Sequence, residues 1–205
     1  MKYTAVILIL ILTLSLLIGC SGDKKESVPL NKNNVKNNCK IKIEVSFVPQ
    51  KDFVKKKKKK KVEVVTMIPP GYSPGNYEPS PKEMRQFSDA EVYFAIGVPA
   101  EQINILPKVS SINKNIKVVK LHKKVNKIYP DREFSPGKRD PHIWLSPKRV
   151  EIMVENISKI LSKIDSNNQS YYRKNAKDFK QKLEKTDLYI KNLLSYMKNR
   201  NFLIY

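Results

Sequence analysis

Four apolar segments between residues 41 and 121 alternate with short helical patterns, and this alternation constrains the fold more than any other feature of the chain. Each segment has the length and the β-branched or aromatic content of a strand, and the four span residues 41–47, 62–68, 92–97 and 116–121. The third is apolar almost throughout, which is typical of a strand covered on both faces. Strands that alternate with helices predict a parallel, doubly wound α/β sheet.

Two Ser-Pro pairs indicate where helices begin. Ser80 precedes Pro81, and Ser146 precedes Pro147. In each pair the serine is predicted to cap a helix that carries proline at its first position. Another short helix is expected from residue 100 to about residue 107.

The second half of the chain has a helical pattern. Apolar residues recur every three or four positions from residue 147 to 164, and a longer helix is predicted from about 169 to 198. The apolar face of the longer helix is narrow, which favours a strut on the surface over a helix buried in a single core. Residues 202–205 are again apolar and strand-like. A strand at this point has nothing after it to pair with, so the chain is predicted to be cut within its fold.

The first 20 residues predict a lipoprotein signal peptide. A positive residue, Lys2, is followed by an apolar run from residue 5 to 18 and then by Gly19 and Cys20. The run is shorter than the roughly 18 residues that a membrane-spanning helix needs. The pattern resembles the lipobox of bacterial lipoproteins, so Cys20 is the expected lipidation site; a secretory signal cut near Gly19 is the alternative. Two acyl chains on Cys20 would anchor the protein to the outer face of the cytoplasmic membrane.

Residues 21–40 are polar, rich in asparagine and lysine, and free of aromatic residues. Such a segment cannot bury enough apolar surface to fold, so we expect a flexible tether. Cys39 lies in this tether. Once Cys20 is acylated, Cys39 has no partner cysteine, so no intramolecular disulfide is expected.

The formal net charge of +21 suggests an anionic partner. Export of the chain argues against nucleic acid and in favour of anionic lipid headgroups or envelope polymers. Solvated lysines would explain the charge without any partner. The seven consecutive lysines of Lys55–Lys61 stand where a helix should pack between the first two strands, yet they offer no apolar face. We interpret them as a solvated loop, with attraction to an anionic surface as the alternative.

Three motifs, in order, resemble the metal-binding extracellular lipoproteins of zinc and manganese ABC importers. The motifs are VVTMIPPGYSPGNYEPSP at 64–81, FSDA at 87–90 before a strand, and DPHIWLSP at 140–147. The resemblance runs from about residue 41 to 205. It implies two α/β lobes joined by one long helix, with the metal held between the lobes. The chain would then hold a Rossmann-like N-terminal lobe at 41–145, a helical segment at 146–200 and the start of a truncated second lobe at 201–205, with the rest of the C-terminal lobe missing.

The resemblance makes His142 the expected metal ligand. Imidazole suits zinc and manganese, and a site needs about four converging ligands. Pro141 and Pro147 restrain the loop that carries His142, and Trp144 and Leu145 are expected to anchor that loop to the core.

The chain departs from the family pattern at Gly75, where the first ligand histidine is expected. Glu78 and Asp140 could supply oxygen ligands instead, although Glu78 also suits a structural role in its loop and Asp140 suits orienting the His142 loop. His122 lies in a lysine-rich stretch and is predicted to be a surface residue. With so few ligands, we expect only weak metal binding by this chain alone.

No catalytic motif is evident, and the chain is not predicted to be an enzyme. The predicted function is that of a substrate-binding lipoprotein that captures zinc or manganese and delivers it to the permease of an ABC importer. The alternative is a basic envelope lipoprotein of the adhesin kind, which would bind anionic surface polymers without metal. Neither hypothesis involves nucleic acid.

Overall fold

The computed structural model describes residues 40–54 and 62–198. Several predictions lie outside these residues: the signal peptide with Cys20, the tether with Cys39, the loop at Lys55–Lys61, and the start of a second lobe at 201–205.

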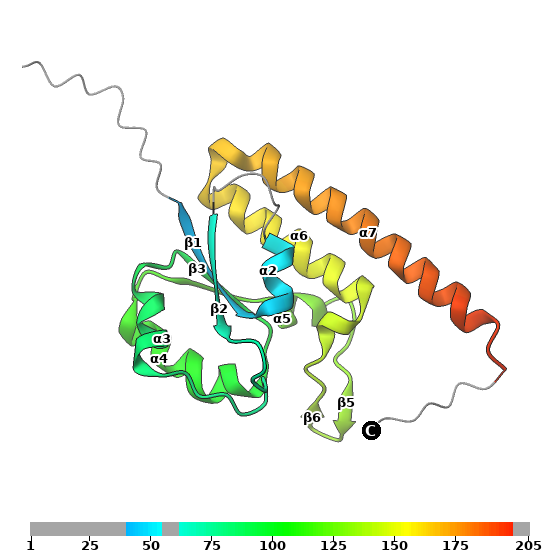
Figure 1. The fold of residues 1–205 in the computed structure, drawn as a ribbon, viewed down its shortest axis with the longest axis horizontal. Coiled ribbons are helices and arrows are strands. Elements are labelled where there is room, and N and C mark those ends of the chain that lie inside the picture. Colours follow the sequence, from blue (N-terminus) through cyan, green and yellow to red (C-terminus); the bar gives the residue numbers. More distant parts are fainter. Residues whose placement is uncertain (1–39, 55–61, 199–205) are drawn as a thin grey trace, which may run out of the picture. The chain divides into compact units, whose positions relative to one another are not determined.

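A four-stranded parallel sheet forms the centre of the fold (Figure 1). Its order is β2-β1-β3-β4, with bounds Ile41–Phe47 for β1, Val62–Ile68 for β2, Val92–Ala95 for β3 and Lys117–Lys120 for β4. Ile43 of β1 lies opposite Val64 on one side and Val92 on the other. The predicted α/β class with a parallel sheet is therefore confirmed.

The strand order reverses between β1 and β3. From β1 the chain crosses to β2 on one side and then returns to β3 on the other side. In open parallel sheets, ligands bind beyond the carboxyl ends of the strands at such a switch point. The ends of β1 and β3 are thus where a binding site is expected.

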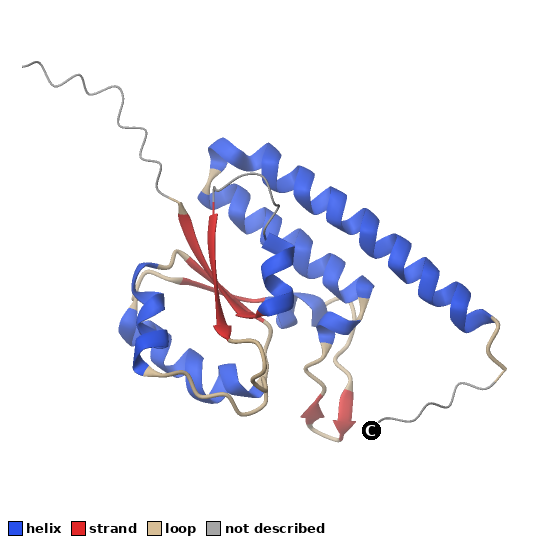
Figure 2. Cartoon of the chain, viewed as in Figure 1, coloured by secondary structure: helices blue, strands red, loops and turns tan. Residues whose placement is uncertain are grey.

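Helices cover both faces of the sheet (Figure 2). Helices α2, α5 and α6 pack together on one face, α3 and α4 lie on the other, and α7 packs along the outside of α6. The helical bounds are Val48–Val54 (α2), Pro81–Met84 (α3), Leu106–Ile112 (α4), Leu121–Asn126 (α5), Pro147–Ile164 (α6) and Gln169–Ser195 (α7). Short helical turns span Arg85–Asp89, Glu101–Ile105, Ile143–Leu145 and Ser166–Asn168, and a hairpin joins β5 (Glu133–Ser135) to β6 (Lys138–Arg139).

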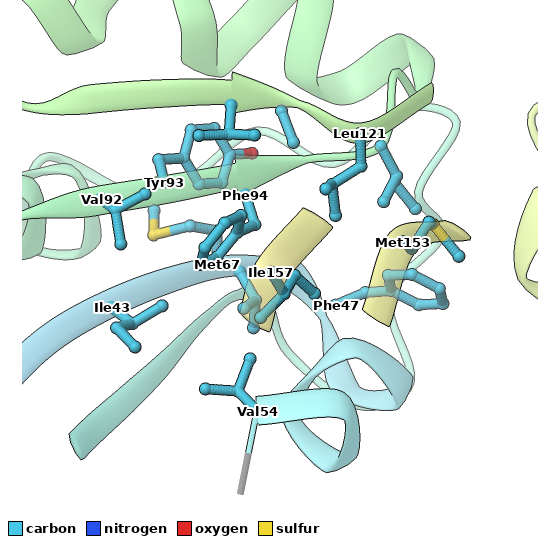
Figure 3. Packing of buried hydrophobic residues seen from close by; sticks show 14 of the residues in the cluster. Ile43, Phe47, Val54, Met67, Val92, Tyr93, Phe94, Leu121, Met153 and Ile157 are labelled. Carbon is cyan, nitrogen blue, oxygen red and sulfur yellow. The ribbon is translucent and has the colours of Figure 1, made fainter. Parts of the chain in front are cut away.

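The core lies between the sheet and α6 on one side and between the sheet and α3 and α4 on the other. Every residue of β3 is buried, as predicted for a strand covered on both faces. Met153 and Ile157 of α6 pack toward the strand residues Ile43, Phe47 and Phe94 (Figure 3). Each fully buried apolar side chain of this kind contributes about 1.5–3 kcal/mol.

The two Ser-Pro pairs behave differently. Ser80 accepts a hydrogen bond from the main-chain N–H of Glu83 and forms a capping box with it, which confirms the predicted cap of α3. Ser146 occupies the predicted N-cap position of α6, with Pro147 in the first turn, but its side chain makes no capping hydrogen bond. The helix predicted from residue 100 to about Pro107 was given too early an end, because α4 continues to Ile112. Pro107 lies in the first turn of α4, where the missing main-chain N–H breaks no hydrogen bond.

Helix α7 is largely a surface element. Among its described residues only Tyr172 and Ala176 are buried. Toward its far end, Leu188, Leu193 and other apolar side chains are exposed. This matches the predicted strut. None of the described helices combines the length and the apolarity needed to span a membrane.

Candidate metal site

The loop that carries His142 is fixed to the switch point of the sheet by two contacts. The ring of Trp144 packs edge-on against Phe47, the last residue of β1, with 4.4 Å between the ring centroids. Nη1 of Arg139 donates a 3.0 Å hydrogen bond to the carbonyl oxygen of Gly97, just beyond β3. His142 lies between these two anchors along the chain, so the fold holds it at the carboxyl ends of β1 and β3.

Asp140 orients the ring of His142. One carboxylate oxygen, Oδ1, lies 2.6 Å from Nδ1 of His142 and accepts a 2.9 Å hydrogen bond from the main-chain N–H of the same residue. Burial raises the pKa of Asp140, but the hydrogen bonds from His142 outweigh it and leave that pKa below its ordinary value. A charged carboxylate can only accept, so Nδ1 is the donor in this contact, which leaves Nε2 as the ring nitrogen that can bind a metal. This carboxylate–histidine pairing is the usual way in which a protein orients a metal-ligating imidazole.

Aromatic side chains flank the His142 ring. The ring lies 5.0 Å from that of Trp144 and 5.9 Å from that of Phe134 on β5. Its side chain is still 46% exposed. It borders a cavity of about 150 Å³ lined by Arg132, Asp140, His142, Ile143, Leu145, Ser146 and Arg149. The ring is therefore oriented and also accessible from outside.

The anchoring of this loop differs in part from the prediction. Trp144 contacts the core as expected, but Leu145 is 71% exposed and does not anchor the loop. Ile143 takes that place and is buried. The short turn Ile143–Leu145 explains the exchange, because it turns successive side chains in different directions.

The two other positions singled out from the sequence lie in the loop after β2. Gly75 is exposed and its N–H donates to Oγ of Ser73 at 3.2 Å. The side chain of Glu78 is 71% exposed, and its ion-pair partner, 3.7 Å away, is Lys108 of α4. Within residues 40–54 and 62–198, no three His, Cys, Asp or Glu side chains converge as a metal cage would require. The described residues thus supply one oriented imidazole and an incomplete ligand set.

His122 is not the surface residue that the sequence predicted. Its Nδ1 is inaccessible to solvent and has no hydrogen-bond partner among the described residues. The ring lies over Gly97, where an added Cβ would come within 2.7 Å of Nδ1. Burial, assisted by the nearby charge of Arg139, lowers the pKa of His122 to about 4. His122 lies in the first turn of α5, after an edge strand, and lysines stand at positions 120, 123 and 124, so the local sequence gave no sign of this burial.

Glu101 holds the loop after β3, and the sequence did not point to this role. Its fully buried carboxylate accepts hydrogen bonds from the main-chain N–H groups of Ile96, Gly97 and Val98 and from the hydroxyl of Tyr93. Ser46 of β1 also contacts it. Burial raises its pKa to about 7. Glu101 therefore shapes the loop after β3 to which Arg139 donates a hydrogen bond. The sequence signal that could have indicated it is an acidic residue four positions after Gly97, the last residue of the predicted strand 92–97.

A comparison with protein families decides the relationship. The family described as ZnuA, zinc-uptake complex component A, periplasmic, matches residues 43–205. The chain belongs to this family.

Two similar proteins are both described as substrate-binding lipoproteins of ABC transporters, but their descriptions name different metals. The chain is 28% identical over 192 residues to the manganese ABC transporter substrate-binding lipoprotein PsaA of Streptococcus mitis. The aligned stretch covers 91% of this chain and 60% of PsaA. It is 29% identical over 191 residues to the iron ABC transporter substrate-binding lipoprotein MtsA of Streptococcus pyogenes, covering 91% and 59%. A zinc-bound ZnuA deletion mutant superposes with a TM-score of 0.72 and 32% identity, covering 80% of this chain and 62% of that one.

The chain spans about 60% of the length of the curated relatives it matches. This share fits the predicted N-terminal lobe with its long helix. The family predicted from the three sequence motifs is confirmed.

Proposed function

We propose that the chain forms the N-terminal lobe and connecting helix of a substrate-binding lipoprotein that captures zinc or manganese and delivers it to the permease of an ABC importer. Membership of the ZnuA family supports this proposal. The structural observation that carries it is the His142 ring, which Asp140 orients at the switch point of the sheet. The metal is the cargo of such a protein, so the proposed role is binding and release without catalysis.

His142 is the proposed ligand, through Nε2. Asp140 is proposed to position that ring, since its Oδ1 is already engaged by His142. Glu78 remains a weaker candidate, because it is paired with Lys108. The family resemblance implies that further ligands come from a second lobe. Lipidation at Cys20 and a location on the outer face of the cytoplasmic membrane belong to the same proposal.

The adhesin hypothesis is the less favoured one. The relatives that match most of the chain are described as metal transporter lipoproteins. The lysine run on which that hypothesis depended, Lys55–Lys61, lies outside the described residues.

Isothermal titration of the purified chain with Zn²⁺ and with Mn²⁺ tests the proposal. Because the described residues hold one oriented imidazole and no cage of three ligands, we expect weak binding. His142→Ala should abolish it, since the variant removes the only oriented ring nitrogen in this loop.

The second histidine provides the matched control. His122→Gln removes an imidazole whose Nδ1 is buried, so metal binding should persist in this variant. Binding that survives His142→Ala unchanged, or that is lost in His122→Gln while the fold is retained, would overturn the assignment of His142.

A further inference from the structure

Gly97 lies where the end of β3 meets the loop that carries His142. Its carbonyl oxygen accepts a 3.0 Å hydrogen bond from Nη1 of Arg139, the last residue of β6. The same oxygen accepts a 3.3 Å hydrogen bond from Nε2 of Gln102. The bond between Arg139 and Gly97, which we call the latch, joins two segments that are 42 residues apart in the sequence.

Glu101 sets the direction of the Gly97 carbonyl. Oε2 of Glu101 accepts a 3.1 Å hydrogen bond from the main-chain N–H of Val98. That N–H and the carbonyl of Gly97 belong to the same planar trans peptide group, so they point in opposite directions. Because the carboxylate holds the N–H toward itself, the carbonyl points away from Glu101 and toward Arg139.

The carboxylate of Glu101 is firmly held and strengthens the latch. It is fully buried and also accepts hydrogen bonds from the N–H groups of Ile96 at 3.1 Å and Gly97 at 2.5 Å. A main-chain N–H can only donate, so the ionised carboxylate is the form that satisfies all three. Hydrogen bonds in a chain polarise one another, so a peptide group bonded to a carboxylate offers a better acceptor to a guanidinium.

The guanidinium of Arg139 is held from a second side. Its Nε lies 3.1 Å from Oδ1 of Asp131 and is inaccessible to solvent. Oδ2 of Asp131 in turn accepts a 2.5 Å hydrogen bond from Nδ2 of Asn126, the last residue of α5. Arg139 is therefore fixed between the end of α5 and the loop after β3.

Arg139 is followed directly by Asp140, the residue that orients the His142 ring. Oδ1 of Asp140 contacts both Nδ1 and the main-chain N–H of His142. The main-chain N–H of Asp140 donates a 2.7 Å hydrogen bond to the carbonyl oxygen of Arg132, which ties it to the other side of the hairpin. The latch thus lies one step further from the metal position than Asp140, on the same chain of contacts.

We propose that Arg139 is a positioning residue for metal capture. Through the Gly97 carbonyl that Glu101 directs, it holds the Asp140–His142 pair at the carboxyl end of β3. This proposal rests on the proposed function, and it gives Arg139 no contact with the metal. Its sign is distinctive: by charge alone, removal of a nearby cation should strengthen the binding of Zn²⁺, whereas loss of the latch should weaken it.

Proton NMR of the full-length chain during titration with Zn²⁺ tests the proposal. The chain has two histidines, so the Hε1 signal of His142 is assigned by its loss in His142→Ala and then reports metal binding directly. Arg139→Gln should weaken Zn²⁺ binding about tenfold, the lower end of the range for residues that orient a metal ligand. Arg139→Lys can still donate to the Gly97 carbonyl, so it should keep the affinity within about threefold of the unchanged chain.

Lys138→Gln is the charge-matched control. Lys138 is exposed on β6, directly before Arg139, and its loss removes the same charge without touching the latch. It should keep the Zn²⁺ affinity within about twofold. Binding by Arg139→Gln that equals or exceeds that of Lys138→Gln would overturn the proposal. Zn²⁺ binding that leaves the His142 signal of the unchanged chain unmoved would instead overturn the proposed function, on which this one rests.

Hydrogen exchange in the unchanged chain gives a second measurement, which does not depend on whether Arg139→Gln folds. If closure of the latch favours Zn²⁺ binding, Zn²⁺ favours closure by the same factor. The Nε–H of Arg139 is buried, so its exchange with water requires the latch to open. Saturating Zn²⁺ should slow this exchange about tenfold in the unchanged chain, as reciprocity with the Arg139→Gln effect requires, and should not alter it in His142→Ala. An exchange rate that is the same with and without Zn²⁺ in the unchanged chain would overturn the proposal.

Discussion

Glu44, in the middle of β1, carries a carboxylate that the fold has removed from water. Its side chain is fully buried, and neither oxygen has a hydrogen-bond partner among the described residues. Burial raises the pKa of Glu44 to about 8; Lys42 opposes the rise, while Asp89 and Glu63 add to it. The folded chain therefore keeps this group protonated at neutral pH.

Glu44→Gln should make stability less dependent on pH. The pKa of Glu44 rises from 4.5 to about 8 on folding, so its favourable contribution is complete below the lower value and is lost as pH rises to the upper one. The loss is at most about 1.4 kcal/mol per pH unit. Urea unfolding between pH 5 and 8 should show a smaller decline for Glu44→Gln than for the unchanged chain. Glu184→Gln, at an exposed position on α7 that does not act on Glu44, should keep the original decline, and equal declines in all three proteins would contradict the prediction.

Gly75→His should strengthen metal binding. Gly75 is not among the glycines with a left-handed backbone, and an added Cβ would meet only Oγ of Ser73, at 3.3 Å. That atom belongs to a flexible side chain, so a histidine fits without breaking the loop. If the family pattern holds, the new imidazole joins His142, and zinc affinity measured by calorimetry should rise about tenfold, or 1.4 kcal/mol.

Gly75→Ala separates the effect of the imidazole from that of the backbone change. It adds the same Cβ without a ligand, so its zinc affinity should equal that of the unchanged chain. The same affinity for Gly75→His and Gly75→Ala would show that position 75 does not face the metal.

At the scale of single residues, the sequence predicted what local motifs encode and missed what tertiary packing decides. The proline-flanked DPHIWLSP motif led to the prediction that His142 is a ligand, and Asp140 of the same motif contacts its ring. Glu44 alternates with Ile43 and Val45, a pattern that suggests a solvated face, but the fold covers both faces of β1 and Glu44 is buried. The buried carboxylate of Glu101 and the inaccessible Nδ1 of His122 likewise depend on contacts that form only in the fold.

Ser80 and Ser146 provide a paired test at the scale of helices. Oγ of Ser80 accepts a 3.3 Å hydrogen bond from the N–H of Glu83, whereas Ser146 caps nothing. Ser80→Ala should therefore lower the free energy of unfolding by about 1 kcal/mol. Ser146→Ala should change it by less than about 0.5 kcal/mol, the usual range for positions without such a feature. Chemical denaturation of the two variants checks this, and equal losses would mean that the capping geometry of α3 contributes nothing.

Elements with a strong periodic pattern were predicted to within a residue or two. The bounds of β1 and β2 match the predicted segments 41–47 and 62–68. The prediction treated the turn Glu101–Ile105 and helix α4 as one short helix that ended near Pro107. That proline in fact stands in the first turn of α4. A proline has the same local appearance in both roles, and only the path of the chain distinguishes them.

The charge of the whole molecule should oppose its folding. The chain carries a formal net charge of +21, and compact states suffer from such self-repulsion. Among the described residues, several ion pairs act the other way, such as Arg139–Asp131 at 3.1 Å and Lys42–Asp89 at 2.5 Å. Most of the ion pairs are exposed at the surface and are worth about 0–1 kcal/mol each, so repulsion between unpaired lysines should dominate.

Added salt should consequently stabilise the protein. The Debye length falls from about 30 Å at 0.01 M to about 3 Å at 1 M, so salt screens the many long-range repulsions among lysines more completely than the few contacts within ion pairs. Thermal unfolding followed by circular dichroism should give a melting temperature that rises with NaCl and rises equally with KCl at the same ionic strength. A melting temperature that falls with either salt would show that the ion pairs outweigh the net charge, and that the lysines of this chain are better compensated than their number indicates.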